Sequence, residues 1–141
     1  MIDIENYMFD SVVTAVTSSY PTCTYYSVST ESPSSFPCIT MEEMDNEVYQ
    51  RSMDSSDLEN HARVSYEINV YSNIDEGKKS QAKAIAQIID SVMQSNNFVR
   101  EFYSPMPNID VTIYRITLRY SGIVSKGVES GQNIVYHIYR K

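Results

Sequence analysis

Two hydrophobic periods follow one another in the middle of the chain. Within residues 63–72 the even positions 64 to 70 are apolar or aromatic and the odd positions are mostly polar, which predicts a strand with one buried face. Over residues 74–93 apolar residues recur at intervals of three and four, which places them on one stripe of a helix. The stripe comprises Ala82, Ile85, Ala86, Ile89, Val92 and Met93. We expect it to pack on the even face of a sheet that contains residues 63–72.

The residues that flank this helix predict its ends. Asn73 and Glu76 stand three positions apart ahead of the stripe, which is the spacing of a capping box. Asn96 and Asn97 follow it, and asparagine tolerates the left-handed conformation that closes many helices. We therefore predict that the helix is capped at Asn73 and stops at the two asparagines.

A second amphipathic helix is predicted over residues 2–18. Its apolar face carries Ile4, Met8, Phe9, Val12, Val13 and Val16. Pro21 ends it, because proline disfavours helix in the residue before it. Residues 22–28 and 36–41 are rich in β-branched and aromatic residues or alternate in polarity, so each predicts a short strand, and the polar residues 29–35 predict a turn between them.

The strongest strand pattern of the C-terminal third covers residues 109–120. Its apolar positions are odd at first and even later, and a switch of that kind predicts a β-bulge near Tyr114 and Arg115. Before it, residues 98–102 form a short apolar patch and residues 105–108 predict a turn.

The end of the chain is predicted to form a turn followed by a strand. Residues 121–131 carry three glycines and predict a turn. Residues 133–139 then predict a last strand that pairs back as a hairpin. Both faces of this strand are apolar or aromatic, so one of them is expected to meet something other than solvent.

Residues 42–61 form a long acidic segment without a sustained period. The segment holds seven acidic residues against a single Arg51. A stretch of this length inside a domain is a functional loop, a hairpin arm that reaches a neighbour, or disorder. Together these patterns predict a single α+β domain over residues 1–141, with two helices packed on a mostly antiparallel sheet of four to five strands.

The charge and the hydropathy of the chain limit the partners that it is expected to bind. The chain has 18 acidic against 11 basic residues, a formal charge of −7, which argues against gripping a nucleic-acid backbone. The same charge leaves open a surface that DNA passes without sticking. No apolar run approaches the roughly 20 residues needed to cross a membrane, and the acidic N-terminus lacks the basic region of a signal peptide, so we expect a cytoplasmic protein. Cys23 and Cys38 are interpreted as buried thiols rather than a disulfide.

A search for catalytic and metal-binding patterns favours a protein that is not an enzyme and has no cofactor. The sequence has no P-loop, no GxGxxG, no GxSxG and no HExxH. Asp57, Glu59 and His61 have the ligand types of a metal site, but a solvated loop is the favoured interpretation. His137, among tyrosines, is interpreted as a half-buried strand residue rather than a base.

Charged and aromatic clusters give the candidate contact residues. Lys78, Lys79 and Lys83 lie near the start of the central helix, the unfavourable end for cations. They form either a solvated face or a contact with an acidic neighbour, such as the 42–61 segment of an adjacent copy. The candidate interface residues are Lys78, Lys79, Lys83, Glu42, Glu43, Arg51, Tyr136, His137 and Tyr139.

The layout of the whole chain resembles the tail terminator proteins of long-tailed phages, also called tail completion or head–tail joining proteins. The segments that carry the resemblance are EINVYSN running into GKKSQAKAI, and RYSGIV followed by a final IYR. The resemblance implies a structural virion protein, assembled in the host cytoplasm, that forms a homo-oligomeric ring, usually a hexamer. Such rings cap the tail tube, stop its polymerisation and meet the head connector, while DNA passes through the channel.

Three alternatives remain open. One is another neck component, such as a minor capsid or head-closure protein. The second is a small-ligand-binding or regulatory α+β domain, and the third is an enzyme. A measurement of size separates them, because a ring supports a neck protein and a monomer or dimer supports the other two.

Overall fold

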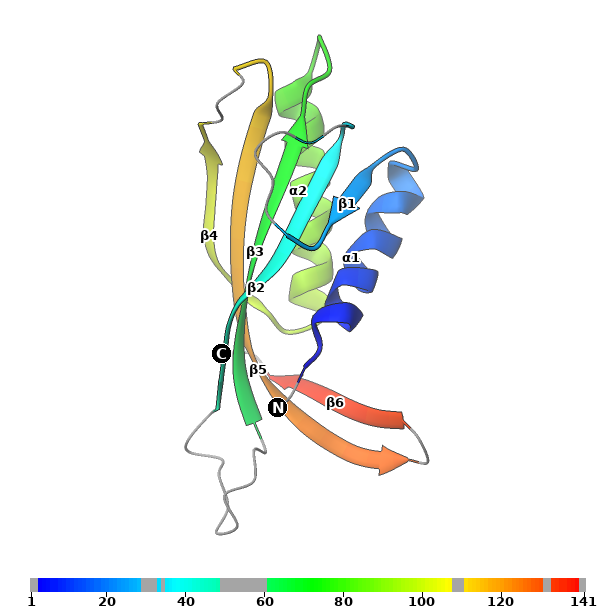
Figure 1. The fold of residues 1–141 in the computed structure, drawn as a ribbon, viewed down its shortest axis with the longest axis vertical. Coiled ribbons are helices and arrows are strands. Elements are labelled where there is room, and N and C mark those ends of the chain that lie inside the picture. The colour runs from blue at the N-terminus through cyan, green and yellow to red at the C-terminus, as the bar shows by residue number, and fades with distance from the viewer. Residues whose placement is uncertain are drawn as a thin grey trace.

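Six strands form one sheet in the computed structural model of the chain, which describes residues 3–28, 33, 35–48, 61–107, 111–130 and 133–139 (Figure 1). The elements are α1 (Glu5–Ser19), β1 (Thr24–Tyr26), β2 (Cys38–Val48), β3 (His61–Ser72), α2 (Lys78–Ser95), β4 (Val99–Met106), β5 (Tyr114–Ser130) and β6 (Asn133–Tyr139). The strand order is β1-β2-β3-β5-β4, and β6 also pairs with β5. Every pair is antiparallel except β1 with β2. The predicted α+β class is confirmed.

The described sheet has one strand more than the four to five predicted. The additional strand is β4, whose first residues the sequence predicts only as an apolar patch. Its edge position explains the weak pattern, because the side chains of an edge strand are less buried and alternate less clearly. Residues 105 and 106 of the predicted turn end this strand, and residue 108 lies outside the described residues.

The two helices cover one face of the sheet and build the main core with it. The predicted stripe of α2 is buried at Ala82, Ile85, Ala86, Ile89 and Met93, with Val92 partly buried at its margin. The even positions of β3, which are Val64, Tyr66, Ile68 and Val70, are buried against it. On α1 the buried positions are Met8, Val12 and Val16, and Ile4, just before the helix, is buried as well. The predicted packing of the α2 stripe on the even face of β3 is therefore confirmed.

The ends of α2 confirm one prediction and correct the other. The helix begins at Lys78 after Gly77, whose φ is 84°, and no side chain caps it, so the predicted capping box at Asn73 is wrong. Glycine takes this left-handed conformation without a steric penalty, which sets the start four residues later. At the other end Asn97 has φ 66°, as predicted, and its N–H donates to the Gln94 carbonyl at 3.0 Å. The N–H of Phe98 donates to the Met93 carbonyl at 2.9 Å, which completes a Schellman motif.

The predicted bulge near Tyr114 and Arg115 is wrong, and so is the predicted turn over residues 121–130, while residue 131 lies outside the described residues. β5 pairs with β3 without interruption from Tyr114 to Ser125. The switch of apolar positions from odd to even therefore marks the start of the strand, which follows a turn at residues 111–113. β5 also continues through Gly122. A Cβ at that position would lie 3.0 Å from Cδ1 of Phe98, so this glycine makes room for a ring instead of turning the chain.

The acidic segment is also corrected in its first part. Residues 42–48 belong to β2 and pair with β3, with a register shift at Met44 between Glu43 and Asp45. Residues 42–48 therefore form one strand of an antiparallel pair and not a loop. Residues 49–60 lie outside the described residues. A strand near the sheet edge accommodates these acids because their side chains reach solvent.

The two cysteines are buried and free. Cys23 belongs to the main core, whereas Cys38 lies in a smaller cluster with Tyr71 and Ile113. Burial raises the pKa of the Cys23 thiol to about 11, and burial also raises the pKa of Cys38. Both thiols therefore stay protonated and unreactive in the folded chain. Within the described ranges, no helix is long and apolar enough to span a bilayer.

Candidate interaction surface

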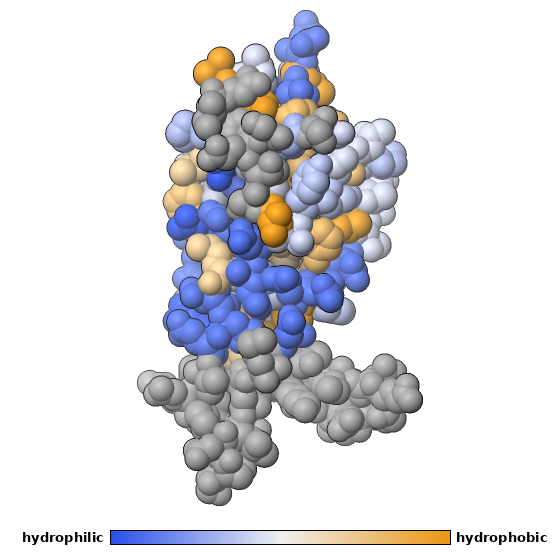
Figure 2. All heavy atoms as spheres, in the orientation of Figure 1, coloured by the Kyte–Doolittle hydropathy of each residue, from blue (hydrophilic) through white to orange (hydrophobic). Residues whose placement is uncertain are grey.

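The second face of the sheet carries none of the described helices and presents rows of polar side chains. Figure 1 views this face, with α2 behind the strands, and Figure 2 shows hydrophilic residues gathered across its middle. Across the strands, Glu42 of β2 is opposite Glu67 of β3, which is opposite Arg119 of β5. In β4, Phe102 is opposite Arg119. The face therefore holds charges of both signs on a rigid frame.

One ion pair organises this row. Arg119 Nη2 lies 3.3 Å from Glu67 Oε1, and its guanidinium carbon lies 5.0 Å from the centre of the Phe102 ring. The arginine side chain is 46 % exposed, so the pair is worth about 1 kcal/mol or less. The row carries charges of both signs and its arginine is exposed, which suits contact with a charged partner.

The upper part of the same face is buried and internally bonded. Asn69 Oδ1 accepts from Arg115 Nε at 3.0 Å and from Thr117 Oγ1 at 2.7 Å. The Arg115 guanidinium also lies 5.7 Å from the centre of the Tyr71 ring. These contacts lock the side chains, so this part serves the fold. Among the residues whose side chains are described, no group of three His, Cys, Asp or Glu could hold a metal ion.

The predicted neighbours Glu42 and Glu43 lie on opposite faces of β2. Glu42 is on the polar face, whereas Glu43 turns toward α1 and Tyr66. Glu43 Oε1 lies 3.4 Å from the donating hydroxyl of Tyr66, and the Glu43 N–H donates to Glu5 Oε2 at 3.2 Å. Burial, followed by the charges of Glu5 and Asp3, raises the pKa of the Glu43 carboxyl above its ordinary value of 4.5.

We expect Glu43→Gln to stabilise the fold slightly at pH 7, by about 0.5 kcal/mol or less because the side chain is partly solvated. The folded protein holds the Glu43 proton more tightly than the unfolded chain, so stability falls as the pH rises from 4.5 through the raised pKa. Thermal melts between pH 4 and 7 should show a flatter profile for Glu43→Gln. Glu42→Gln is the matched control, and a loss of stability at pH 7 would contradict the expectation.

The predicted lysine cluster divides into two. Lys78 Nζ donates to the carbonyl oxygens of Val111 and Thr112, at 3.4 and 3.2 Å, so it ties α2 to the turn before β5. Lys79 and Lys83 are exposed and form no ion pair with any described residue. The structure therefore assigns Lys78 to the fold and leaves the other two available.

The remaining predicted residues are placed by backbone only or not at all. In β6, Tyr136 is opposite Lys126, His137 opposite Ser125 and Tyr139 opposite Ile123. The half-burial of His137 stays a prediction, because its side chain lies outside the described part. Arg51 and the Asp57–Glu59–His61 set also lie outside the described side chains. β6 and the start of α2 lie at opposite ends of the molecule (Figure 1), so the predicted interface residues do not form one patch.

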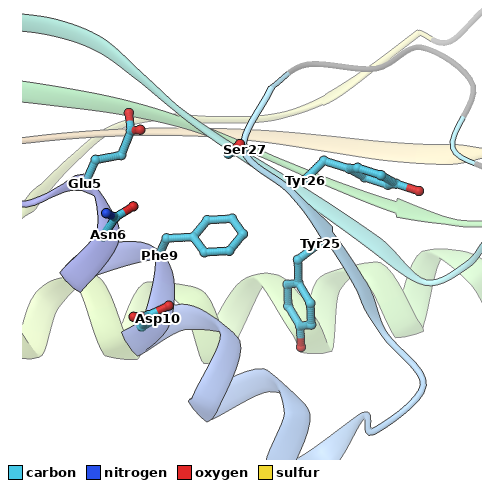
Figure 3. Close-up of a pocket in the computed structure, with 7 residues that line it drawn as sticks. All are labelled: Glu5, Asn6, Phe9, Asp10, Tyr25, Tyr26 and Ser27. Carbon is cyan, nitrogen blue, oxygen red and sulfur yellow. The ribbon is translucent and has the colours of Figure 1, made fainter.

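A pocket of about 470 Å³ that sequence reasoning did not predict lies between α1 and β1 (Figure 3). It is lined by Glu5, Asn6, Phe9, Asp10, Tyr25, Tyr26 and Ser27. Phe9 projects from α1 toward Tyr25, with Glu5 on one side and Asp10 on the other. The two rings meet edge to face with their centres 6.4 Å apart, and the Tyr25 hydroxyl lies 2.8 Å from Thr17 Oγ1. The pocket therefore has fixed aromatic walls and an acidic rim.

A comparison with models of known protein families and with curated proteins finds no match to this chain.

Proposed function

We propose that the protein is a ring-forming tail terminator of a long-tailed phage, a structural virion component that caps the tail tube, stops its polymerisation and provides the surface that docks to the head. The proposal rests on the resemblance of the sequence and on one structural observation. That observation is the arm formed by the end of β5 and by β6, which extends beyond the rest of the sheet (Figure 1).

The arm is a two-stranded hairpin. β3 reaches only as far as Ser125 along β5, whereas β5 continues to Ser130 and is paired there with β6. Among the described elements β6 packs extensively only against β5. An isolated hairpin of two strands is marginally stable in water, and its free edges are templates for pairing with another chain. An arm of this kind supports assembly with a neighbour, by edge pairing or by packing of its faces.

The charge of the chain supports the channel of such a ring. A formal charge of −7 makes the protein repel phosphates over a Debye length of about 10 Å at 0.1 M salt. A channel wall with this sign keeps DNA moving without specific binding. In this proposal the partners are further copies of the chain, the tail tube protein and the head connector, and the protein acts without catalysis or a cofactor.

The size of the purified protein tests the assembly. We expect sedimentation velocity to show a closed ring of about six copies, since head-to-tail contacts between two different surfaces of each copy can close into a cyclic oligomer. A monomer or a dimer at all concentrations, with and without tail tubes, would favour the regulatory or enzymatic alternatives.

A phage that lacks the protein tests the role. It should produce full heads and separate tails whose tubes are overgrown or irregular in length, because nothing stops polymerisation. Electron microscopy of the lysate measures both features, and a lysate of the complemented mutant is the control. Regular tails attached to heads would overturn the terminator role. Tails of normal length that fail to join heads would favour the head-closure alternative.

A further inference from the structure

We infer that the pocket between α1 and β1 is the docking site for Lys79 and Lys83 of a second copy of the chain. The inference rests on the proposed assembly of copies and specifies which two surfaces meet.

The pocket has the chemistry of a receptor for a cationic side chain. Glu5 and Asp10 flank the ring of Phe9, and Tyr25 forms the opposite wall (Figure 3). An ammonium group over an aromatic face is attracted by the ring, and a carboxylate beside it adds a charged hydrogen-bond acceptor. The aromatic walls also suit the apolar stem of lysine.

Within the described part of the chain, the carboxylates around the pocket lack a cationic partner. Among the described residues, Asp3, Glu5, Asp10 and Glu43 form no ion pair, and Glu5 accepts instead from the backbone N–H of Glu43 at 3.2 Å. The charges of Glu5 and Asp3 are strong enough to help burial raise the pKa of Glu43. A positive group from outside would relieve this repulsion.

The lysines of α2 supply a matching pair of charges. Lys79 and Lys83 are four positions apart, so they lie on one stripe of the helix, and both are exposed without an ion pair in the described part of the chain. Lys78, which is already bonded to the turn before β5, is not available.

These lysines do not reach the pocket of their own chain. The Tyr7 hydroxyl on the first half of α1 donates to Asn96 Oδ1 at the end of α2, at 3.4 Å, so the two helices run in opposite directions. Seventeen residues separate Lys79 from Asn96, roughly 25 Å along a helix at 1.5 Å per residue. A lysine side chain is much shorter than that. The contact therefore joins two copies. Each copy offers the pocket and the lysines as two separate surfaces, and head-to-tail contacts between such surfaces close into a ring when the rotation from one copy to the next allows it.

Charge reversal on each surface tests the inference. Asp10→Lys in one protein and Lys79→Glu with Lys83→Glu in another should each weaken self-association by roughly tenfold or more, because like charges then face each other. An equimolar mixture of the two should restore assembly into particles in which the variants alternate. A single chain that carries all three changes should also assemble. Sedimentation velocity measures the assembly, and circular dichroism checks that each variant is folded.

The matched control is Asp45→Lys, which makes the same change of charge on the opposite face of the sheet and should leave association unchanged. If Asp10→Lys assembles like the wild type, or if the mixture stays dissociated, the lysine–pocket contact is wrong while the ring proposal stands. If the wild type itself forms no oligomer with or without tail tubes, both are wrong.

Discussion

Replacing Phe98 with alanine is expected to destabilise the fold by about 3–5 kcal/mol, the range for removal of a buried aromatic side chain. Phe98 is fully buried just after α2, and its ring meets that of Tyr66 edge to face with 5.6 Å between the centres. The ring also lies against Gly122 of β5. Urea denaturation of Phe98→Ala should therefore show a much lower midpoint with an unchanged slope.

The contact with Gly122 gives this prediction an internal control. Gly122→Ala should cost about 1–3 kcal/mol on its own, because the added methyl would lie 3.0 Å from a ring carbon of Phe98. In the Phe98→Ala background the same change should cost less, since the methyl enters the space left by the ring. Additive costs in this double-mutant cycle would show that the two positions do not share that space.

Ile89→Ala is expected to cost about 2–5 kcal/mol, the range for large-to-small changes in a core. Ile89 is fully buried at the centre of the α2 stripe and belongs to the main core. The control is Gln87→Ala, which alters an exposed position on the same helix and should change stability by about 0.5 kcal/mol or less. A loss below about 0.5 kcal/mol for Ile89→Ala in a denaturant melt would mean that the stripe is not the centre of the core.

The elements that sequence reasoning predicted well are those whose burial is one-sided. β3 and α2 each present one apolar face to the same core, so their periods of two and of 3.6 residues appear directly in the sequence. The C-terminal stop of α2 was also predictable, because Asn97 adopts the left-handed conformation that its residue type tolerates.

The elements that sequence reasoning missed depend on partners that are distant in the chain. A glycine in a sequence indicates either a turn or a site where another group packs closely on the backbone. At Gly122 that group is the Phe98 ring, which the sequence around Gly122 does not reveal. β2 continues through its acids because β3 pairs with it, which no local pattern of Glu42 to Val48 reveals.

The candidate contact residues also show that sequence patterns miss features made by residues distant in the chain. The exposed Lys79 and Lys83 could be identified from the sequence, but the pocket could not, because Phe9 and Tyr25 meet only after α1 and β1 are placed. Glu42 and Glu43 look like a pair in the sequence, yet the alternation of a strand sends them to opposite faces.

The central position of β5 has a consequence for how the chain folds. This strand pairs with β3, β4 and β6, and its buried residues close the core under α2. Its partners in β3 are distant in the chain, since Ser72 pairs with Tyr114 and His61 with Ser125. Pairings of such large sequence separation form slowly, because a long loop must close before any contact compensates for the lost entropy. During synthesis the edge of β3 that pairs with β5 therefore stays unpaired until β5 has left the ribosome. A chain that stops before residue 114 lacks the strand that completes the sheet.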